Sequence, residues 1–315
     1  MMDLQLRAAL LANLADLQPG DHVVVGCSGG ADSVALLRAS VHVGKELRLR
    51  VGAIVIDHQL QPDSSQVASK ASVIATELGA DPTVMIPVDV AQGPGSGGIE
   101  AAARNARRTA FELYATHNDA RAVLLGHTRD DQAETVLLGL ARGSGARSLS
   151  GMREIDGLYR RPFLTVSREA VRATVADLDT YDDPHNDEFR FSRVRTRAVV
   201  LPVLENELGP GIAEALARTA DMLRDDADAL DVIAMNSKTM QVDELAYLPA
   251  AIRTRVLRTL AIESGCTVND LTREHVLAVD ALITRWHGQG PINLPGSINV
   301  TRAHGKLMFN KAPKE

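Results

Sequence analysis

The most informative stretch of this 315-residue chain reads Val23-Val24-Val25-Gly26-Cys27-Ser28-Gly29-Gly30-Ala31-Asp32-Ser33. Three consecutive β-branched residues predict a strand that is buried on both faces. Gly29 and Gly30 permit a tight turn and a close backbone approach by a ligand. A helical run begins at Ser33, so the free N–H groups of its first turn predict an anion site. Because Asp32 would repel a phosphate, we expect Mg²⁺ to lie between them.

Two common nucleotide-binding patterns do not fit this stretch. No lysine stands near Ser33, as a Walker A loop requires, and the glycine spacing is not G-x-G-x-x-G. The segment resembles the S-G-G-x-D-S loop of the PP-loop ATP pyrophosphatases. That resemblance implies cleavage of ATP between its α and β phosphates, leaving an adenylated substrate and pyrophosphate. The ATP-binding residues expected in the loop are Ser28, Gly29, Gly30, Ala31, Asp32 and Ser33.

Length and composition set the broad class. With 315 residues and 45% hydrophobic content, the chain is long enough for two globular domains. Cys27 and Cys266 are the only cysteines, which excludes a disulfide framework or a C-x-x-C zinc site. No signal-cleavage pattern or membrane-length apolar run is seen, so we expect a cytoplasmic protein without membrane contact. The sequence leaves the oligomeric state open, a homo-oligomer included.

The order of predicted elements indicates an α/β fold with an open parallel sheet and helices on both faces. Strands are expected at residues 23–25, 47–56, 83–88 and 122–126, and helices at 4–14, 33–43, 64–77 and 167–178. We assign these elements to a domain at residues 1–207. Helical periodicity dominates from about residue 209, and a β-hairpin is expected within 290–310. This part is assigned to a smaller, mainly helical domain at residues 208–315.

Polar residues follow the second and fourth predicted strands. In an open α/β sheet ligands bind at the carboxyl ends of strands, so Asp57 and His58 are expected to face the nucleotide or its co-substrate. The segment after the fourth strand places Asp130 and Glu134 four residues apart on one helix face. Like charges at this spacing repel unless a metal ion, a bound amine or an arginine lies between them. The alternative is ordinary acidity at a helix N-terminus.

Arginines are concentrated in three segments. One is a predicted helix in which Glu100, Arg104, Arg107 and Arg108 share one side, as an ion-paired face or as a row beside polyphosphate or tRNA. Another is a Gly/Ser-rich loop at residues 142–152, which suits wrapping over an anion or a flexible linker. The formal net charge of −6 does not exclude tRNA, because binding needs only a local patch. Arg142, Arg147, Arg193, Arg195 and Arg197 are the candidates for such a patch.

The order of motifs resembles the tRNA(Ile)-lysidine synthetases. The resemblance covers most of residues 22–204. It rests on Ser28–Ser33, Asp57-His58-Gln59-Leu60, Glu100-Ala101-Ala102-Ala103-Arg104, Asp130-Asp131-Gln132-Ala133-Glu134-Thr135, Arg142-Gly143-Ser144-Gly145, Leu149-Ser150-Gly151-Met152, Arg161-Pro162-Phe163-Leu164, Asp182-Asp183-Pro184-His185-Asn186 and Arg193–Arg197. The last third resembles the compact form of the family much more weakly.

The resemblance implies a two-step ligation. ATP activates C2 of the wobble cytidine in an isoleucine tRNA with a CAU anticodon, and the ε-amine of free L-lysine then displaces AMP. On this basis Asp32, with Asp131 or Glu134, is expected to hold Mg²⁺. Asp130 and Glu134 suit the ammonium groups of lysine, whereas Arg104 suits its carboxylate or the tRNA. A carboxylate or His127 would take the proton from the amine. We expect Glu134→Ala to abolish lysine incorporation while the fold stays intact.

Three other functions use related features. A tRNA thiolation enzyme shares the adenylation step but needs reactive thiols or a bound cluster, which Cys27 and Cys266 do not suggest. An ATP-dependent amide-forming synthetase has the same loop but no support from residues 130–152. A non-catalytic RNA-binding relative would have lost the chemistry, and the intact loop argues against that. Pyrophosphate release separates the last class from the enzymes, and dependence on lysine separates the ligase from the thiolase.

Overall fold

The computed structural model describes residues 3–60, 63–90, 98–143, 145–184, 188–268 and 270–311. The chain forms two compact units, unit 1 (Met1–Asp221) and unit 2 (Met222–Glu315). The glycine-rich stretch at residues 93–98 lies, except for Gly98, outside the described residues, as do His185, Asn186 and Asp187. Each unit has its own hydrophobic core.

Unit 1 is built on a six-stranded sheet with the order β3-β2-β1-β4-β6-β5. All neighbours are parallel except β5 and β6, which form an antiparallel pair at one edge. The strands are β1 (His22–Gly26), β2 (Arg50–Asp57), β3 (Thr83–Pro87), β4 (Ala120–Leu124), β5 (Ile155–Asp156) and β6 (Tyr159–Arg160). The predicted open parallel α/β sheet is therefore confirmed.

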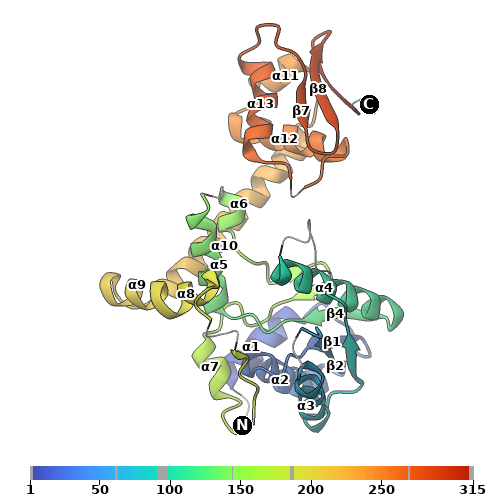
Figure 1. Ribbon diagram of the computed structural model, residues 1–315, viewed down its shortest axis with the longest axis vertical. Coiled ribbons are helices and arrows are strands. Elements are labelled where there is room, and N and C mark those ends of the chain that lie inside the picture. Colours follow the sequence, from blue (N-terminus) through green and yellow to red (C-terminus); the bar gives the residue numbers. More distant parts are fainter. Residues whose placement is uncertain are drawn as a thin grey trace. The chain divides into compact units, whose positions relative to one another are not determined.

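Both faces of the sheet are buried, as the run of valines predicts. Val23 and Val25 contribute to the core on one face, whereas Val24 contributes to the core on the other. Figure 1 shows α4 over one face of the strands and α1, α2 and α3 on the opposite side. The helices are α1 (Leu4–Asn13), α2 (Ala31–Leu47), α3 (Ser64–Glu77) and α4 (Ile99–His117). This layering brings the carboxyl ends of β1 and β4 together beside the start of α2.

Several shorter helices complete unit 1. They are α5 (Arg129–Ala141), α6 (Ala146–Leu149), α7 (Arg168–Ala173), α8 (Ser192–Arg195), a π-helical turn η2 (Thr196–Val200) and α9 (Leu201–Leu208). The prediction that a strand begins at Leu47 was wrong, because α2 continues to that residue and ends at Arg48 in a left-handed conformation (φ 57°). The helix predicted over 167–178 is also shorter, since turns replace it after Ala173.

Unit 2 combines helices with a small antiparallel sheet. The helix α10 (Ile212–Asn236) contains the boundary between the units and is followed by α11 (Val242–Tyr247), α12 (Ala250–Glu263) and α13 (Arg273–Thr284). The predicted hairpin is a three-stranded sheet of β7 (Ile292–Leu294), β8 (Ile298–Ala303) and β9 (Lys306–Lys311). Leu257, Leu282 and Val300 join helices and sheet in one core. Within the described residues, none of the helices has the length and apolarity needed to cross a membrane.

Candidate active site

The Ser28–Ser33 loop forms a tight turn between β1 and α2. Gly29 adopts a positive φ of 83°, which glycine accommodates without strain. The Ser33 hydroxyl donates to Gly30 O at 2.9 Å and accepts from Ser28 N at 3.1 Å, while the two serine Oγ atoms lie 3.2 Å apart. Among the described residues, no side chain caps the start of α2 at Gly30. The first-turn N–H groups and the helix dipole therefore favour an anion at this position.

Two segments hold the loop against the sheet. Tyr181 N donates to Gly29 O at 2.9 Å, which ties the loop to a chain segment far away in sequence. Gly126, two residues after the end of β4, lies so close to α2 that a Cβ there would sit 2.8 Å from Asp32 O. The backbone position of Asp32 thus depends on a glycine in the segment that follows β4.

Asp131 and Glu134 lie near the start of α5, directly after β4. Asp131 Oδ2 accepts hydrogen bonds from N and Oγ1 of Thr128, both at 2.8 Å, in a capping box. Glu134 is fully buried. Hydrogen bonds and the Arg168 guanidinium outweigh burial and hold the pKa of Asp131 below its usual value.

Arginines supply the positive charge that these carboxylates need. Arg168 Nη2 donates to Asp131 Oδ1 at 2.8 Å and to Glu134 Oε1 at 3.0 Å. Arg197 Nε donates to Glu134 Oε1 at 2.7 Å and its Nη2 to Oε2 at 3.2 Å, while Arg193 Nε lies 3.5 Å from Oε2. Of the three cations weighed from the sequence, arginine is therefore the one that the structure places here.

The same contacts test whether the site fits Mg²⁺. Asp32 fits, because its carboxylate is part-exposed beside the anion site and, within the described residues, accepts a hydrogen bond from Arg172 Nε alone, at 3.1 Å. Glu134 does not fit the expected metal role, since both oxygens are engaged by guanidinium groups in the interior. Within the described part of the chain, no three His, Cys, Asp or Glu side chains converge on one point. A Mg²⁺ ion here would rely on phosphate oxygens and water, which this ion commonly does.

Asp130 contacts α7 rather than Glu134. Its Oδ2 accepts from Arg168 N at 2.8 Å, and Arg129 N donates to Val166 O at 2.9 Å. These two bonds join the starts of α5 and α7. Asp130 therefore has a structural partner, although the sequence offered it for lysine.

A second group of side chains surrounds His127 at the end of β4. Burial is the largest cause that lowers its pKa, Asp131 acts in the opposite direction, and Arg161, Arg107 and Arg193 lower the pKa further. Together they bring the pKa of His127 to about 4, so the imidazole is neutral near pH 7. A neutral imidazole with this pKa is a weak base, which disfavours His127 as the group that deprotonates an amine. His127 Nδ1 and His58 Nδ1 are buried and make no hydrogen bond within the described residues.

The low pKa of His127 predicts how stability depends on pH. The unfolded chain protonates this histidine near pH 6.5, whereas the folded chain does so only near pH 4. The unfolded state thus binds more protons in this window, and stability falls as the pH drops from 6.5 towards 4. His127→Gln should reduce this loss in urea titrations at pH 7 and pH 5. His117→Gln, on the exposed end of α4, is the control. If the free energy of unfolding changes equally with pH in the two variants, His127 is not the cause of the pH dependence.

The remaining candidate residues differ in whether they are buried or exposed and in which groups they contact. Asp57 is buried and accepts from Gln59 N at 3.0 Å, so it shapes the turn after β2. On α4, Arg107 is half-buried and Arg104 is exposed, whereas Arg108 bonds Glu112 on the surface. Arg195 turns back to the carbonyls of Phe189 and Arg190 and does not join Arg193 and Arg197. Arg142 and Arg147 lie exposed on either side of the start of α6.

In the sequence Gln132 is only one residue of a motif, whereas in the structure it bonds the main chain of a distant segment. Its buried amide donates to Met152 O at 2.9 Å and accepts from Met152 N at 2.7 Å. A Cβ at Gly151 would lie 2.5 Å from Gln132 Oε1, so glycine is required for this clasp. The clasp fixes the end of the 142–152 segment, which contains α6 and is not a continuous loop.

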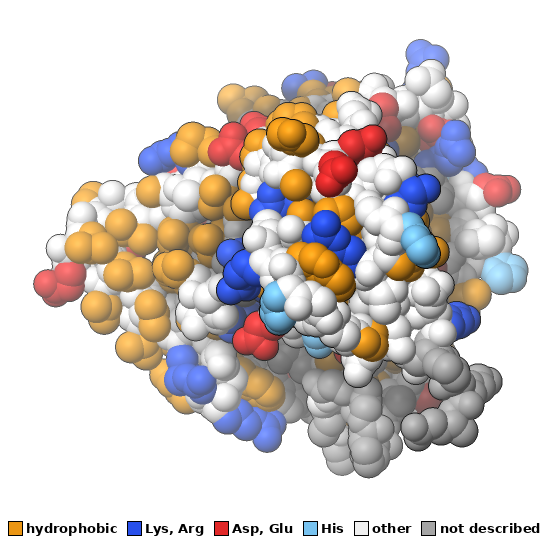
Figure 2. All heavy atoms as spheres, turned by 90° about the horizontal axis from the view of Figure 1, so that it is seen from above, with side chains coloured by type: hydrophobic (Ala, Val, Ile, Leu, Met, Phe, Trp, Pro, Cys, Tyr) orange, Lys and Arg blue, Asp and Glu red, His pale blue; other side chains and the backbone are white. Residues whose placement is uncertain are grey.

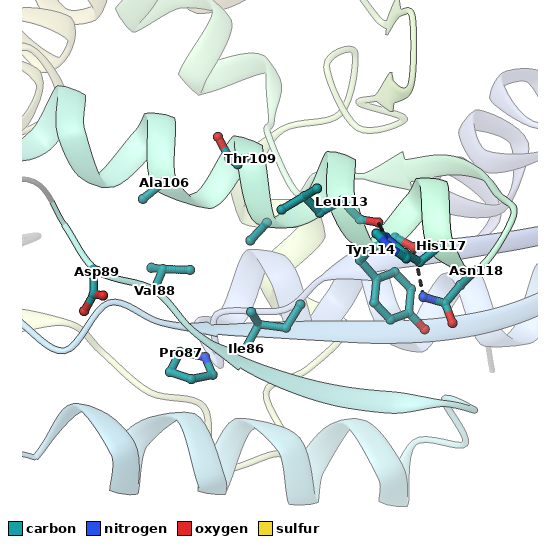
Figure 3. A pocket seen from close by; sticks show the side chains of 11 residues that line it. Ile86, Pro87, Val88, Asp89, Ala106, Thr109, Leu113, Tyr114, His117 and Asn118 are labelled. Atoms are coloured by element: carbon teal, nitrogen blue, oxygen red, sulfur yellow. Dashed lines mark hydrogen bonds between the residues drawn. The ribbon is translucent and has the colours of Figure 1, made fainter.

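One hollow in unit 1 lies away from these residues. It is a groove of about 530 Å³ between β3 and the second half of α4. Figure 3 shows Ile86 and Val88 facing Leu113 and Tyr114 across it. None of the predicted site residues lines this groove, so it is not the candidate active site.

Comparisons with known proteins agree with this geometry. Residues 2–204 match the family model of the PP-loop domain, and residues 240–308 match the TilS substrate binding domain. A structure of the U34-tRNA thiolase NcsA from Methanococcus maripaludis, with its 4Fe–4S cluster, shares the fold. Its TM-score is 0.56 at 16% identity, and the match covers 70% of this chain and 78% of that one.

The fold, the Ser28–Ser33 loop and the match to the PP-loop domain together define a PP-loop protein that uses ATP. Relatives that match nearly the whole chain identify the family within this class. The tRNA(Ile)-lysidine synthase of Thermobifida fusca is 48% identical over 97% of this chain and 96% of its own. That of Leifsonia xyli is 49% identical over 93% and 91%. The chain belongs to the tRNA(Ile)-lysidine synthase family. The thiolation alternative is not supported: both cysteines are buried with raised pKa values, and they lie in different units.

Proposed function

We propose that the protein ligates L-lysine to C2 of the wobble cytidine of a CAU-anticodon tRNA(Ile), with ATP as the energy source. The observation that carries this proposal is the uncapped start of α2 lying beside the Asp131–Glu134 carboxylates at the ends of β1 and β4. The start of α2 would bind the phosphates of ATP, and the carboxylates would bind the ammonium groups of lysine. An ATP-dependent transfer of an amine requires both. Since tRNA, ATP and free lysine are substrates, we expect the protein to act in the cytoplasm.

In the first step, the C2 oxygen of the cytidine attacks the α-phosphorus, and pyrophosphate leaves. The N–H groups of the Ser28–Ser33 loop and the Ser28 hydroxyl would hold the phosphates where negative charge accumulates. Mg²⁺, held by Asp32 together with phosphate oxygens, would neutralise part of this charge. The half-buried Arg107 and the other arginines around His127 add positive potential.

In the second step, the ε-amine of lysine attacks C2, loses a proton, and AMP departs with the former carbonyl oxygen. The ammonium form of lysine would approach Asp131 and Glu134, the carboxylates at the start of α5. Both are paired with guanidinium groups, so the incoming cation would displace one of them. Arg193 and Arg197 retain about a third of their side-chain exposure and are the ones free to move. The proton would pass to water, because the pKa of Asp131 lies below the ordinary carboxyl value and makes this carboxylate a weak base.

Recognition of tRNA would use exposed arginines and unit 2. Arg104, Arg142 and Arg147 are exposed on unit 1, where phosphate contacts are sterically open. Unit 2 contains the whole of the match to the substrate binding domain. Lys, Arg and His side chains lie among hydrophobic ones near the centre of the face in Figure 2. We expect tRNA affinity to weaken as salt rises.

The direct test is incubation with ATP, labelled lysine and tRNA transcripts that differ only at the wobble base. Label should enter the transcript with the CAU anticodon and not one in which the wobble cytidine is replaced. Pyrophosphate and AMP should appear in equal amounts. Label that depends on a sulfur donor, or no pyrophosphate release, would contradict the proposal.

Replacing Asp32 with asparagine should slow pyrophosphate release by roughly 10²-fold, because a charge that organises the phosphates is lost. Its side chain is part-exposed and its bond to Arg172 lies near the surface, so the melting temperature should change little. Asp177→Asn removes a similar exposed pair with Arg38 and serves as the control. Normal pyrophosphate release by Asp32→Asn would exclude its role with the metal.

A further inference from the structure

Arg168 is the residue that touches most parts of the site, and the sequence pattern did not single it out. It is the first residue of α7, whose start is capped by Ser167. Its backbone N–H bonds Asp130, and its Nη2 bonds both Asp131 and Glu134 on α5. Its Nε is buried, makes no hydrogen bond to the residues that the structure describes, and lies 3.8 Å from Asp32 Oδ2 in the nucleotide loop. One side chain thus borders both halves of the site.

Arg168 is also the least exposed of the arginines that contact Glu134. Its side chain is 12% exposed, compared with 33% for Arg193 and 30% for Arg197. Main-chain bonds at Arg168 and Arg129 fix the start of α7 against α5. Therefore Arg193 and Arg197 can be displaced by an arriving cation while Arg168 stays in place.

The geometry points to Arg168 as a positioning residue that keeps the α5 carboxylates aligned with Asp32 of the nucleotide loop. This inference rests on the proposed function, because it concerns how the amine and nucleotide subsites are held in register. Nη2 of the guanidinium bonds Asp131 and Glu134, while Nε of the same planar group lies 3.8 Å from Asp32 Oδ2. A lysine carries the same charge on a single nitrogen, so it cannot serve both directions.

The test compares Arg168→Lys and Arg168→Ala in the full-length protein, measuring pyrophosphate release and lysine transfer separately. Arg168→Lys should lower kcat for both steps by about 10- to 100-fold, since small misplacement of reacting groups has large effects. The KM for ATP should change less than about threefold, because the phosphate-binding N–H groups stay in place. Guanidinium ions, well below unfolding concentrations, should partly restore Arg168→Ala by filling the vacated space.

Arg38→Ala is the matched control. Arg38 joins α2 to the segment after α7 through Thr174 O and Asp177, on the outside of the same interface. It should retain wild-type kcat in both steps. Wild-type kcat in Arg168→Lys would overturn the inference, as would an Arg168→Ala protein of normal melting temperature that guanidinium does not restore. If Arg168→Ala does not fold, the kcat of Arg168→Lys alone decides whether Arg168 is a positioning residue.

Failure of the proposed function would look different. In that case the wild-type protein would release pyrophosphate with tRNA but would transfer no lysine. The effect of Arg168→Lys on kcat for pyrophosphate release could still be measured, and it would still support or overturn the role of Arg168.

Discussion

Replacing Glu134 with alanine should abolish lysine incorporation and also lower the free energy of unfolding by about 3–5 kcal/mol. Glu134 is fully buried, and its two oxygens face Arg168, Arg193 and Arg197. Its removal would leave all three guanidinium groups short of negative charge, and Arg168 is the most buried of them. The sequence led to the expectation that the fold stays intact in this variant, whereas the burial of Glu134 points to a loss of stability.

Urea unfolding and labelled-lysine incorporation measure the two effects of Glu134→Ala. Glu112→Ala is the control, because Glu112 pairs with Arg108 on the surface of α4 and should change stability by less than about 1 kcal/mol. Glu134→Gln keeps the side-chain shape and should be more stable than the alanine variant while remaining impaired in catalysis. Equal stability of Glu134→Ala and the wild-type protein would contradict the structural role given to this carboxylate.

Gly126→Ala should abolish the ATP-dependent step although residue 126 carries no functional group. The new Cβ would lie 2.8 Å from Asp32 O and 3.2 Å from Ser33 Cα, both of them main-chain atoms at the start of α2. The clash can be relieved only by shifting the first turn of the helix, which misplaces the phosphate-binding N–H groups. Overpacking of this kind also costs about 1–3 kcal/mol in stability.

Isothermal titration with ATP and thermal melting would test the Gly126 prediction. Gly290→Ala is the matched control, because a Cβ there meets nothing within 4 Å. It should bind ATP as the wild-type protein does. ATP binding by Gly126→Ala with unchanged affinity would show that the first turn of α2 tolerates the displacement.

The sequence predicted best those features that depend on local pattern. The valine run, Gly29 and the helix start fall within a few residues, so the β1–loop–α2 unit could be read directly. Element ends were less certain: α2 extends to Leu47 because Arg48 adopts a left-handed conformation that nothing in the pattern required. The helix after Ser167 is short because the following segment turns towards Gly29.

Contacts between side chains that are far apart in the sequence could not be predicted from local sequence patterns. Asp130 and Glu134 were noticed because they lie four residues apart, but their partner Arg168 stands more than thirty residues further on. The burial of Arg107 depends on how α4 lies against the sheet, which its spacing with Arg104 and Arg108 does not fix. Arg195 falls among functional arginines in sequence, yet helix geometry directs it away from Arg193 and Arg197.

The ion-pair cluster has a consequence for selectivity in a crowded cell. Asp32, Asp130, Asp131 and Glu134 are matched by Arg168, Arg172, Arg193 and Arg197, so the cluster as a whole is electrically neutral. A passing polyamine or free arginine meets no net attraction from it and gains nothing unless it replaces a guanidinium group already in place. Neutrality at rest therefore protects these carboxylates from the many abundant cations that are not the substrate.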